Sequence, residues 1–338
     1  MSIYYYRPLV QTGSERPQGA LPLAGGICWF TTVELLERNK PSVFVPASRL
    51  PDDVLARLTE ARKEICGLTF ETPRLMGILN VTPDSFSDGG RFNGAAMSLL
   101  HAKDMVEAGA DIIDVGGEST RPGAAEVPSE AEIARTAPVI QALRGILGVP
   151  ISIDTRKAAV AEAAYDAGAN MVNDVSGFTF DTALGPFCAS NDLPVFVMHS
   201  QGEPETMQNN PIYENVIFDV YDFLEARVDA LVAAGIARER IVIDPGIGFG
   251  KKIEHNLSLM SNLSIFHGLG CAILLGVSRK GFIRTIGGGE EPSARMPGSV
   301  ALALAGVSQG VQLLRVHDVF ETKQALQLWL AVIKGNLQ

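Results

Sequence analysis

From about residue 74 onward, short apolar runs alternate with longer stretches in which apolar residues have helical spacing. Apolar runs without internal alternation are typical of parallel strands that are buried on both faces. The runs are Leu75–Leu79, Ile112–Val115, Ile151–Ile153, Met171–Val172, Val195–Met198, Ile241–Ile243, Ala272–Gly276 and Val311–Leu314. Eight strand–helix units of this kind predict an α/β fold, a closed (β/α)8 TIM barrel.

Three of these units are near-repeats, which begin at Gly109, Gly168 and Gly310. In each, a glycine follows the helix, where it takes the left-handed cap conformation without steric cost, and a buried strand comes next. An open, doubly wound sheet is the alternative architecture. The chain lacks the Gly-x-Gly-x-x-Gly turn that such sheets carry at a dinucleotide site, so the even spacing favours the barrel.

Residues 1–73 do not follow this alternation. We predict that they form an N-terminal extension packed on the barrel, which occupies residues 74–338. Tyr4–Val10 and Gly26–Thr32 have the composition of strands. Pro51–Cys66 predicts an amphipathic helix, with Val54, Leu58 and Ile65 on its apolar face.

The composition restricts the class of protein. The 338 residues include 28 Lys and Arg against 38 Asp and Glu, and the resulting charge of −10 argues against nucleic-acid binding. No window approaches 18 uninterrupted apolar residues, and the first residues lack a signal-peptide pattern, so we expect no membrane association. The four cysteines show neither C-x-x-C nor zinc-ligand spacing, which indicates reduced thiols in a cytoplasmic protein.

Polar residues stand at or just past the ends of the predicted strands. In a barrel these ends share one mouth, where active sites lie. The residues are Asn80, Asp114, Glu118, Asp154, Asn173, Asp174, His199, Asp244, Ser278, Arg279, Lys280, Arg315 and His317. A helix cap or a structural salt bridge is the plain alternative for any single residue, and it suits Asp154 before Thr155-Arg156-Lys157. Capping does not account for Lys280, Arg315 and His317.

The predicted mouth has two chemical halves. Asp154, Asn173 and Asp244 offer hydrogen-bond acceptors, which suit a nitrogen heterocycle that presents N–H donors. A second set supplies positive charge for a phosphorylated group: Arg121, Lys251, Arg315 and His317. An acceptor-rich floor beside a cationic rim indicates a heterocycle that carries an anionic leaving group.

Glycine-rich loops follow the first two predicted strands, at residues 80–90 and 116–123. Long loops of small residues with proline and glycine close over ligands and exclude water. Glycine and proline also simply turn the chain, but turning alone would not need Phe86 in the first loop or Arg121 in the second. We therefore expect both loops to take part in the site.

A series of ordered segments resembles the motifs of the dihydropteroate synthase family. Met76–Gly90 resembles its first signature and Gly116–Ala124 its second. The others, in family order, are Ile153–Lys157, Val172–Asp174, Val197–His199, Thr206–Gln208, Asp244–Lys251, Ser278–Lys280 and Arg315–Asp318. A single glycine motif would be weak, whereas this many motifs in order make the resemblance specific.

The resemblance implies a transferase of folate biosynthesis and a target of sulfonamides. Its substrates would be 6-hydroxymethyl-7,8-dihydropterin pyrophosphate and p-aminobenzoate, and its products 7,8-dihydropteroate and pyrophosphate. The resemblance also implies a homodimer. We expect a dissociative substitution, in which the electron-rich ring stabilises a cationic methylene while the leaving group's charge is drawn off electrostatically.

The resemblance assigns roles to residues of this chain. The pterin would be held by Asp154, Asn173, Asp244 and Lys280, with Met198 and Phe249 lining its slot. The pyrophosphate would be contacted by Thr120, Arg121, Arg315 and His317, and its Mg2+ would be bound by Asn80. Pro83 and Phe86 would help to close the p-aminobenzoate pocket. The catalytic residues would be Asp154, Asp244, Lys280, Arg315 and His317.

Some positions depart from the family pattern. Ile247 stands where many members carry a second Phe, and Ser200 replaces a frequent Met. Gly281 follows Lys280 where Ser is common beside the p-aminobenzoate site, which affects the shape of that pocket and hence sulfonamide affinity. Residues 1–73 exceed what most members carry. None of these departures removes a group that the chemistry needs.

Other functions share such a barrel. A pterin-binding methyltransferase domain would have the acidic floor but would not need Lys280, the Arg315–His317 pair or the loop at residues 82–86. A non-catalytic pterin-binding paralogue would have lost loop or anion-site residues. A phosphate-binding barrel isomerase would carry a glycine-rich phosphate loop after the seventh and eighth strands. The motifs favour the synthase.

Overall fold

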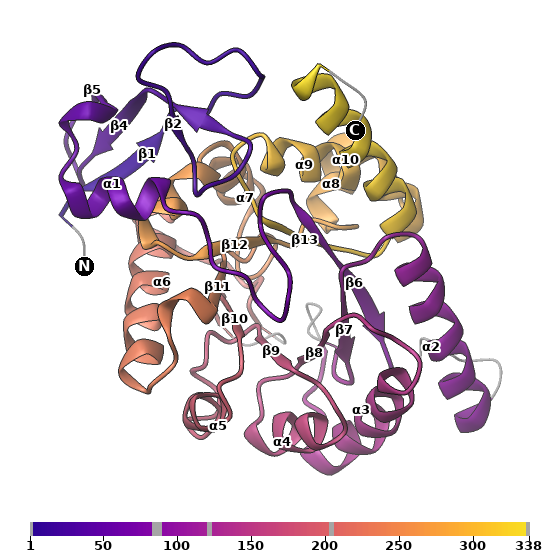
Figure 1. Ribbon diagram of the computed structural model, residues 1–338. Helices are drawn as coiled ribbons and strands as arrows, with labels where there is room; N and C mark the ends of the chain where they lie inside the picture. Colours follow the sequence, from indigo (N-terminus) through magenta and orange to yellow (C-terminus); the bar gives the residue numbers. More distant parts are fainter. Residues whose placement is uncertain (1–2, 83–89, 120–123, 203–205, 336–338) are drawn as a thin grey trace.

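The computed structural model describes residues 3–82, 90–119, 124–202 and 206–335, with the backbone alone for residues 90–95. Its centre is a closed barrel of eight parallel strands, in which β13 pairs with β6 (Figure 1). The strands are β6 (Arg74–Asn80), β7 (Ile112–Gly116), β8 (Ile151–Asp154), β9 (Met171–Asp174), β10 (Val195–Met198), β11 (Ile241–Asp244), β12 (Ala272–Leu275) and β13 (Leu313–Val316). The predicted (β/α)8 barrel is confirmed.

Helices surround the barrel between successive strands (Figure 1). They are α2 (Gly90–Glu107), α3 (Ser129–Arg144), α4 (Ala158–Asp166), α5 (Leu184–Ser190), α6 (Val216–Ala233), α7 (Ile253–Ser261), α8 (Gly281–Gly287), α9 (Met296–Val307) and α10 (Val319–Lys334). Short 3-10 helices span Arg238–Arg240, Leu263–Leu269 and Pro292–Arg295. None of the helices in the described part of the chain combines the length and apolar character that a bilayer crossing needs.

Each predicted barrel strand is present, but the last one begins two residues later than the apolar run suggests. The run starts at Val311, whereas β13 starts at Leu313. The reason is that the Val311 N–H still donates to the Gly306 carbonyl in the last turn of α9. The strand also ends later than the apolar run, at Val316, so Arg315 lies inside it.

Alternate residues of each barrel strand point into the interior, where they form layers. The layer at the amino-terminal end is an apolar cluster that includes Ile112, Met171 and Leu313. Two residues further along the same strands, the interior positions carry Asp114, Asn173 and Arg315. A polar layer therefore lies on an apolar one, on the side of the barrel mouth.

The segment that precedes β6 closes the opposite end of the barrel. Ile65 and Phe70 belong to the same apolar cluster as Met76 of β6 and Phe196 of β10. In Figure 1 this segment crosses the face of the barrel between α1 and β6. Ligands must therefore enter from the carboxyl-terminal mouth.

The extension has its own sheets and helix, and its core includes Phe30, Val33 and Leu58. A three-stranded antiparallel sheet has the order β1-β4-β5, and a two-stranded sheet pairs β2 with β3. The elements are β1 (Tyr5–Pro8), β2 (Leu21–Pro22), β3 (Trp29–Phe30), β4 (Thr32–Leu36), β5 (Val43–Pro46), a 3-10 helix (Ala47–Arg49) and α1 (Asp52–Thr59). The Tyr5 ring stacks on Phe218 of α6 with 4.3 Å between centroids, which joins the extension to the barrel.

The helix predicted over Pro51–Cys66 is wrong in its second half, because α1 ends at Thr59. Backbone pairing with the β2–β3 loop replaces helix hydrogen bonds there: Ala24 donates to the Leu58 carbonyl, and Arg62 donates to the Ala24 carbonyl. Ile65, expected on the helix face, instead reaches the bottom of the barrel. Tertiary contacts thus override a continuous amphipathic pattern.

Candidate active site

A cavity of about 1200 Å³ opens at the carboxyl-terminal mouth of the barrel. Nine residues predicted for the site line it: Asn80, Asp154, Asn173, Met198, Asp244, Phe249, Lys280, Arg315 and His317. They come from seven of the eight strands or the turns that follow them. The predicted site residues Pro83, Phe86, Thr120 and Arg121 lie outside the described residues.

The centre of the polar layer is the Arg315 guanidinium, which lies between two carboxylates. Its Nε donates to Asp114 Oδ2 at 2.6 Å, and its Nη2 donates to Asp154 Oδ2 at 2.7 Å. Asn173 Nδ2 donates to the same oxygen of Asp114 at 3.1 Å. The sequence suggested an acidic floor separate from a cationic rim, but the structure has Arg315 among the acids of the floor.

The electrostatics of this layer follow from burial. Burial raises the pKa of Asp154, and the Asp114 carboxylate adds to that rise while Arg315 opposes it. Burial also disfavours the Arg315 cation, but Asp114 and Asp154 more than offset this, so the pKa of Arg315 is raised. Arg315 therefore stabilises both carboxylates and is stabilised by them, whereas the two carboxylates repel each other, so the group depends on all three ions together.

Asp154 retains one unused acceptor. Its Oδ1 atom is buried and has no hydrogen-bond partner in the described structure, while the residue lines the cavity. A buried carboxylate oxygen without a donor costs free energy unless a ligand supplies one. The site is therefore prepared to accept an N–H group.

Asp244 forms a second acceptor on the floor, at the end of β11. The Gly246 N–H donates to Asp244 Oδ1 at 2.7 Å. Burial raises the pKa of Asp244, whereas this N–H and the Lys280 ammonium oppose the rise. Gly246 itself has φ +69°, and a Cβ there would lie 1.8 Å from the His199 carbonyl oxygen, so only glycine permits this turn.

Lys280 and Phe249 form one wall of the cavity. The Lys280 Nζ lies 3.9 Å from the centroid of the Phe249 ring, a cation–π contact. The Lys280 side chain lies directly against Gly248: a Cβ on this glycine would be 3.0 Å from Lys280 Cδ. The wall thus presents an aromatic face and a positive charge beside Asp244.

Lys251, a candidate for the cationic rim, is instead a buried tie within the loop after β11. Its Nζ contacts the carbonyl oxygens of Gly246 at 2.8 Å and Phe249 at 3.0 Å, and His199 Nδ1 at 2.9 Å. Burial lowers the pKa of Lys251 to about 7. Burial also lowers the pKa of His199, and the nearby Lys251 charge lowers it further. A neutral His199 ring would accept the Lys251 hydrogen bond at Nδ1.

His317 is held at the mouth by Ser278. The Ser278 Oγ lies 3.0 Å from His317 Nδ1 and accepts the His317 backbone N–H at 3.1 Å. Arg279, between Ser278 and Lys280, has φ 57° and turns away to pair with Asp318 at 3.0 Å. This turn directs Lys280 and Arg279 to different partners.

A buried ion cluster is centred on Glu118, in the described part of the second glycine-rich loop. Glu118 accepts from Arg156 Nη2 at 2.8 Å and from Lys157 Nζ at 2.5 Å, and Lys157 also pairs with Glu132 at 2.8 Å. The Lys157 Nζ donates further to the Val127 carbonyl at 2.6 Å. Glu118 lines the cavity, so this cluster fixes the described part of that loop, residues 116–119, at the site.

Asn80 is the only predicted metal ligand. A Cβ placed on Gly116 would be 3.7 Å from both Asn80 Oδ1 and Asp154 Oδ2, so the two side chains lie on either side of that glycine. Among the described residues, no group of three His, Cys, Asp or Glu side chains could hold a metal ion. An amide oxygen of this kind suits Mg2+ that keeps waters and phosphate oxygens as its other ligands.

Two contributors to the site were not assigned roles from the sequence. Asp114 was identified only as a strand-end residue, whereas it is the first carboxylate partner of Arg315. Its place two residues after Ile112, on an inward-facing position, was the available signal. Gln208, which the sequence marked only as the last residue of the Thr206–Gln208 motif, lines the cavity and donates to the Gly248 carbonyl at 2.7 Å.

The chain is similar to known proteins over most of its length. The family model "Pterin binding enzyme" matches residues 76–317. A curated dihydropteroate synthase from Synechocystis is 47% identical over 72% of this chain and 85% of its own length.

Solved structures of dihydropteroate synthases are also similar to this chain. The crystal structure of the Yersinia pestis dihydropteroate synthase with a sulfonamide drug complex has a TM-score of 0.75 and 43% identity, over 80% of this chain and 98% of that one. The Xanthomonas albilineans dihydropteroate synthase in complex with 7,8-dihydropteroate has a TM-score of 0.72 and 42% identity, over 78% and 95%.

Replacement of Lys251 by Met should lower the free energy of unfolding by about 2–4 kcal/mol, because several buried acceptors lose their donor. Denaturant unfolding would measure this loss. The matched control is Lys252→Met at the exposed neighbouring position, which should change stability by less than about 0.5 kcal/mol. Equal losses in the two variants would contradict the role of Lys251 as a buried tie.

Proposed function

The chain belongs to the dihydropteroate synthase family of pterin-binding enzymes, and we propose from this that its polar layer holds the pterin while the rim draws off a diphosphate. The activity is a transfer of the pterin-methyl group in folate biosynthesis, which gives 7,8-dihydropteroate. The observation that carries the residue assignment is the buried, unpartnered Oδ1 of Asp154 beside Asp244 and Asn173.

The substitution occurs at the methylene that joins the pterin to its diphosphate. The C–O bond breaks and its electron pair leaves with the diphosphate. The lone pair of the p-aminobenzoate nitrogen then forms the new C–N bond, and that nitrogen releases a proton. The positive methylene is stabilised by the electron-rich ring, so the protein acts mainly through orientation and electrostatics.

Asp154, Asn173 and Asp244 would hold the pterin through its N–H groups, with Met198 as an apolar contact. The support is their common burial on the cavity floor. Carboxylate acceptors make charge-assisted hydrogen bonds, which are shorter and stronger than neutral ones.

Lys280 and Phe249 would complete the pterin slot from the side. Their cation–π contact holds an aromatic face and an ammonium next to Asp244. In this arrangement Asp154, Asp244 and Lys280 act as catalytic residues, because they touch the reacting pterin.

His317 and Arg315, with Thr120 and Arg121, would contact the diphosphate. His317 lines the cavity with one ring nitrogen held by Ser278, and this supports its assignment. Arg315 is held by two carboxylates, so it would serve the diphosphate through its field as well as by contact. Magnesium bound with the diphosphate at Asn80 would neutralise negative charge on the leaving group.

Pro83 and Phe86 would close the p-aminobenzoate pocket. Gly281 lines the same cavity, and a Cβ at this position would meet no atom within 4 Å. The glycine therefore leaves open space where a serine side chain would otherwise stand. We propose that this space alters how the pocket fits p-aminobenzoate and sulfonamides.

Purified protein supplied with 6-hydroxymethyl-7,8-dihydropterin pyrophosphate, p-aminobenzoate and Mg2+ should form 7,8-dihydropteroate and pyrophosphate, detected by chromatography. Chelation with EDTA should lower the rate at least about tenfold, because the charge of the leaving group is then less neutralised. Restoration by added Mg2+ is the control. Full activity in EDTA would contradict the metal assignment, and absence of product under all conditions would contradict the proposed reaction.

Replacement of Asp244 by Asn should weaken pterin binding about 100-fold, since it removes a charged acceptor of hydrogen bonds. Titration calorimetry with a pterin ligand would measure the change. Because burial raises the pKa of Asp244, wild-type affinity should fall as the pH drops towards that pKa, and the variant should show a flatter profile. The control variant Asp229→Asn, at an exposed position, should bind the pterin ligand normally. Normal binding by the Asp244 variant would contradict the assignment of Asp244 to the pterin site.

We propose a homodimer as the working form in the cytoplasm. All four cysteines are free thiols, which supports a reducing compartment. On α10, the apolar side chains of Phe320, Leu328 and Val332 are 61%, 64% and 79% exposed. They project from one side of the helix, as an apolar interface would require.

Analytical ultracentrifugation should give twice the 36.1 kDa chain mass, and Leu328→Glu should shift the protein towards the single-chain mass because a charge enters the apolar contact. The control Leu100→Glu, on exposed α2, should leave the assembly unchanged. A 36.1 kDa species in the wild type would refute the dimer.

A further inference from the structure

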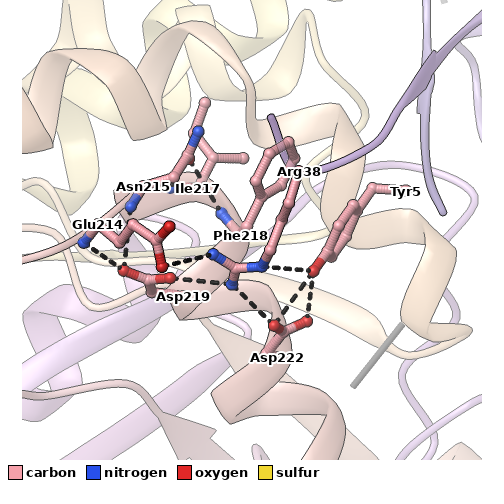
Figure 2. A network of polar contacts seen from close by, with 8 residues as sticks. All are labelled: Tyr5, Arg38, Glu214, Asn215, Ile217, Phe218, Asp219 and Asp222. Carbon is pink, nitrogen blue, oxygen red and sulfur yellow. Dashed lines mark hydrogen bonds and ion pairs between the residues drawn. The ribbon is translucent and has the colours of Figure 1, made fainter. Parts of the chain in front are cut away.

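An arginine of the extension contacts the start of α6. Arg38 Nη2 donates to Asp219 Oδ1 at 2.9 Å and to Asp222 Oδ2 at 2.8 Å, and its Nη1 lies 3.9 Å from Glu214 Oε2 (Figure 2). Tyr5 also donates to Asp222 Oδ1 at 2.9 Å. One guanidinium thus faces three carboxylates that would otherwise repel each other at one end of a helix.

The Asp219 carboxylate connects Arg38 to the backbone that leads into α6. Its Oδ2 accepts the N–H groups of Glu214 at 2.9 Å and Asn215 at 3.2 Å (Figure 2). The other oxygen of the same carboxylate accepts from Arg38. Arg38 therefore fixes the carboxylate that in turn fixes residues 214 and 215.

Residues 206–215, which we call the 206–215 segment, lead from the barrel mouth to this point. Gln208, Asn210 and Pro211 line the cavity. Tyr213 donates through its hydroxyl to the Gly250 carbonyl at 2.7 Å, and Gln208 donates to the Gly248 carbonyl at 2.7 Å. The segment is thus attached at one end to the loop that carries Phe249 and at the other end to Arg38.

The extension lies outside the family match, which begins at residue 76. The match with the Yersinia pestis enzyme includes 98% of that enzyme but 80% of this chain. The Arg38 contact therefore belongs to a part of the chain that the family model does not match.

We propose that Arg38 is a positioning residue, through which the extension holds the 206–215 segment in place at the pterin cavity. The proposal rests on the proposed function, because the bound pterin is the ligand whose capture depends on that segment. Arg38 acts through Asp219 and the backbone, so it affects binding of the pterin substrate more than the chemical step.

The test compares Arg38→Met with Arg7→Met. Arg7 is a matched control, because it also belongs to the extension and pairs with Glu34, at 2.7 Å from its Nε. Its side chain is 23% exposed, against 29% for Arg38. Both changes remove a part-buried arginine of the extension. Arg7 pairs with Glu34 inside the extension, whereas Arg38 pairs with Asp219 and Asp222 of α6.

Hydrogen exchange should show faster exchange of the 206–215 amides in Arg38→Met and wild-type exchange in Arg7→Met. The KM for the pterin diphosphate should rise about fivefold in Arg38→Met, with kcat within about twofold of wild type, and Arg7→Met should keep both values. Unchanged exchange and KM in a folded Arg38→Met protein would overturn the proposal. So would equal changes in both variants.

Arg38→Lys decides the question if Arg38→Met does not fold. It keeps the charge, but a single ammonium cannot reproduce the span of the guanidinium between Asp219, Asp222 and Tyr5. Faster exchange in the 206–215 segment supports the proposal, and wild-type exchange overturns it. Hydrogen exchange needs no substrate, so absence of dihydropteroate from the wild type would refute the proposed reaction while exchange still reports on Arg38.

Discussion

The barrel mouth depends on one buried cation, the Arg315 guanidinium, held between the carboxylates of Asp114 and Asp154. Without it, acids on neighbouring strands would share an interior from which water is largely excluded, at a cost of several kcal/mol. Arg315 stands on the last strand, whereas its partners stand on the second and third strands of the barrel. The ion pairs therefore join the two ends of the barrel sequence, and the polar layer is complete only when the barrel is closed.

The same charges that stabilise the interior also prepare it for a ligand. Asp154 uses one oxygen for Arg315 and leaves the other without a partner in the described structure. Asp244 likewise uses Oδ1 for the Gly246 N–H, while Lys280 is kept near it by Phe249. The apolar layer beneath and the buried Lys251 tie limit movement of these groups. Polar groups fixed in this way need little reorganisation when charge develops during a reaction.

The sequence predicts the barrel well, because uninterrupted apolar runs, glycine caps and strand-end polar residues all indicate the same repeating unit. It also identifies the acceptors Asp154, Asn173 and Asp244, since their strand-end positions are visible along the chain. It does not reveal pairing across the barrel, so Arg315 was expected at the cationic rim. It also does not reveal that Lys251, expected at the same rim, is buried against backbone carbonyl groups. The end of α1 at Thr59 was equally hidden, because the competing partner, Ala24, is distant in sequence. Local patterns determine which element forms, whereas long-range contacts determine where it stops and which charges meet.

The contact between the extension and α6 also has a consequence for biosynthesis. A ribosome releases Tyr5 and Arg38 long before it has made Asp222, which lies 217 positions after Tyr5. The extension must therefore wait until 222 of the 338 residues have been translated before it can dock. During that interval the face of the extension that later packs on α6, including the Tyr5 ring that is fully buried in the folded protein, is exposed to other polypeptides. Nascent polypeptides of this protein would accordingly need shielding early in their synthesis.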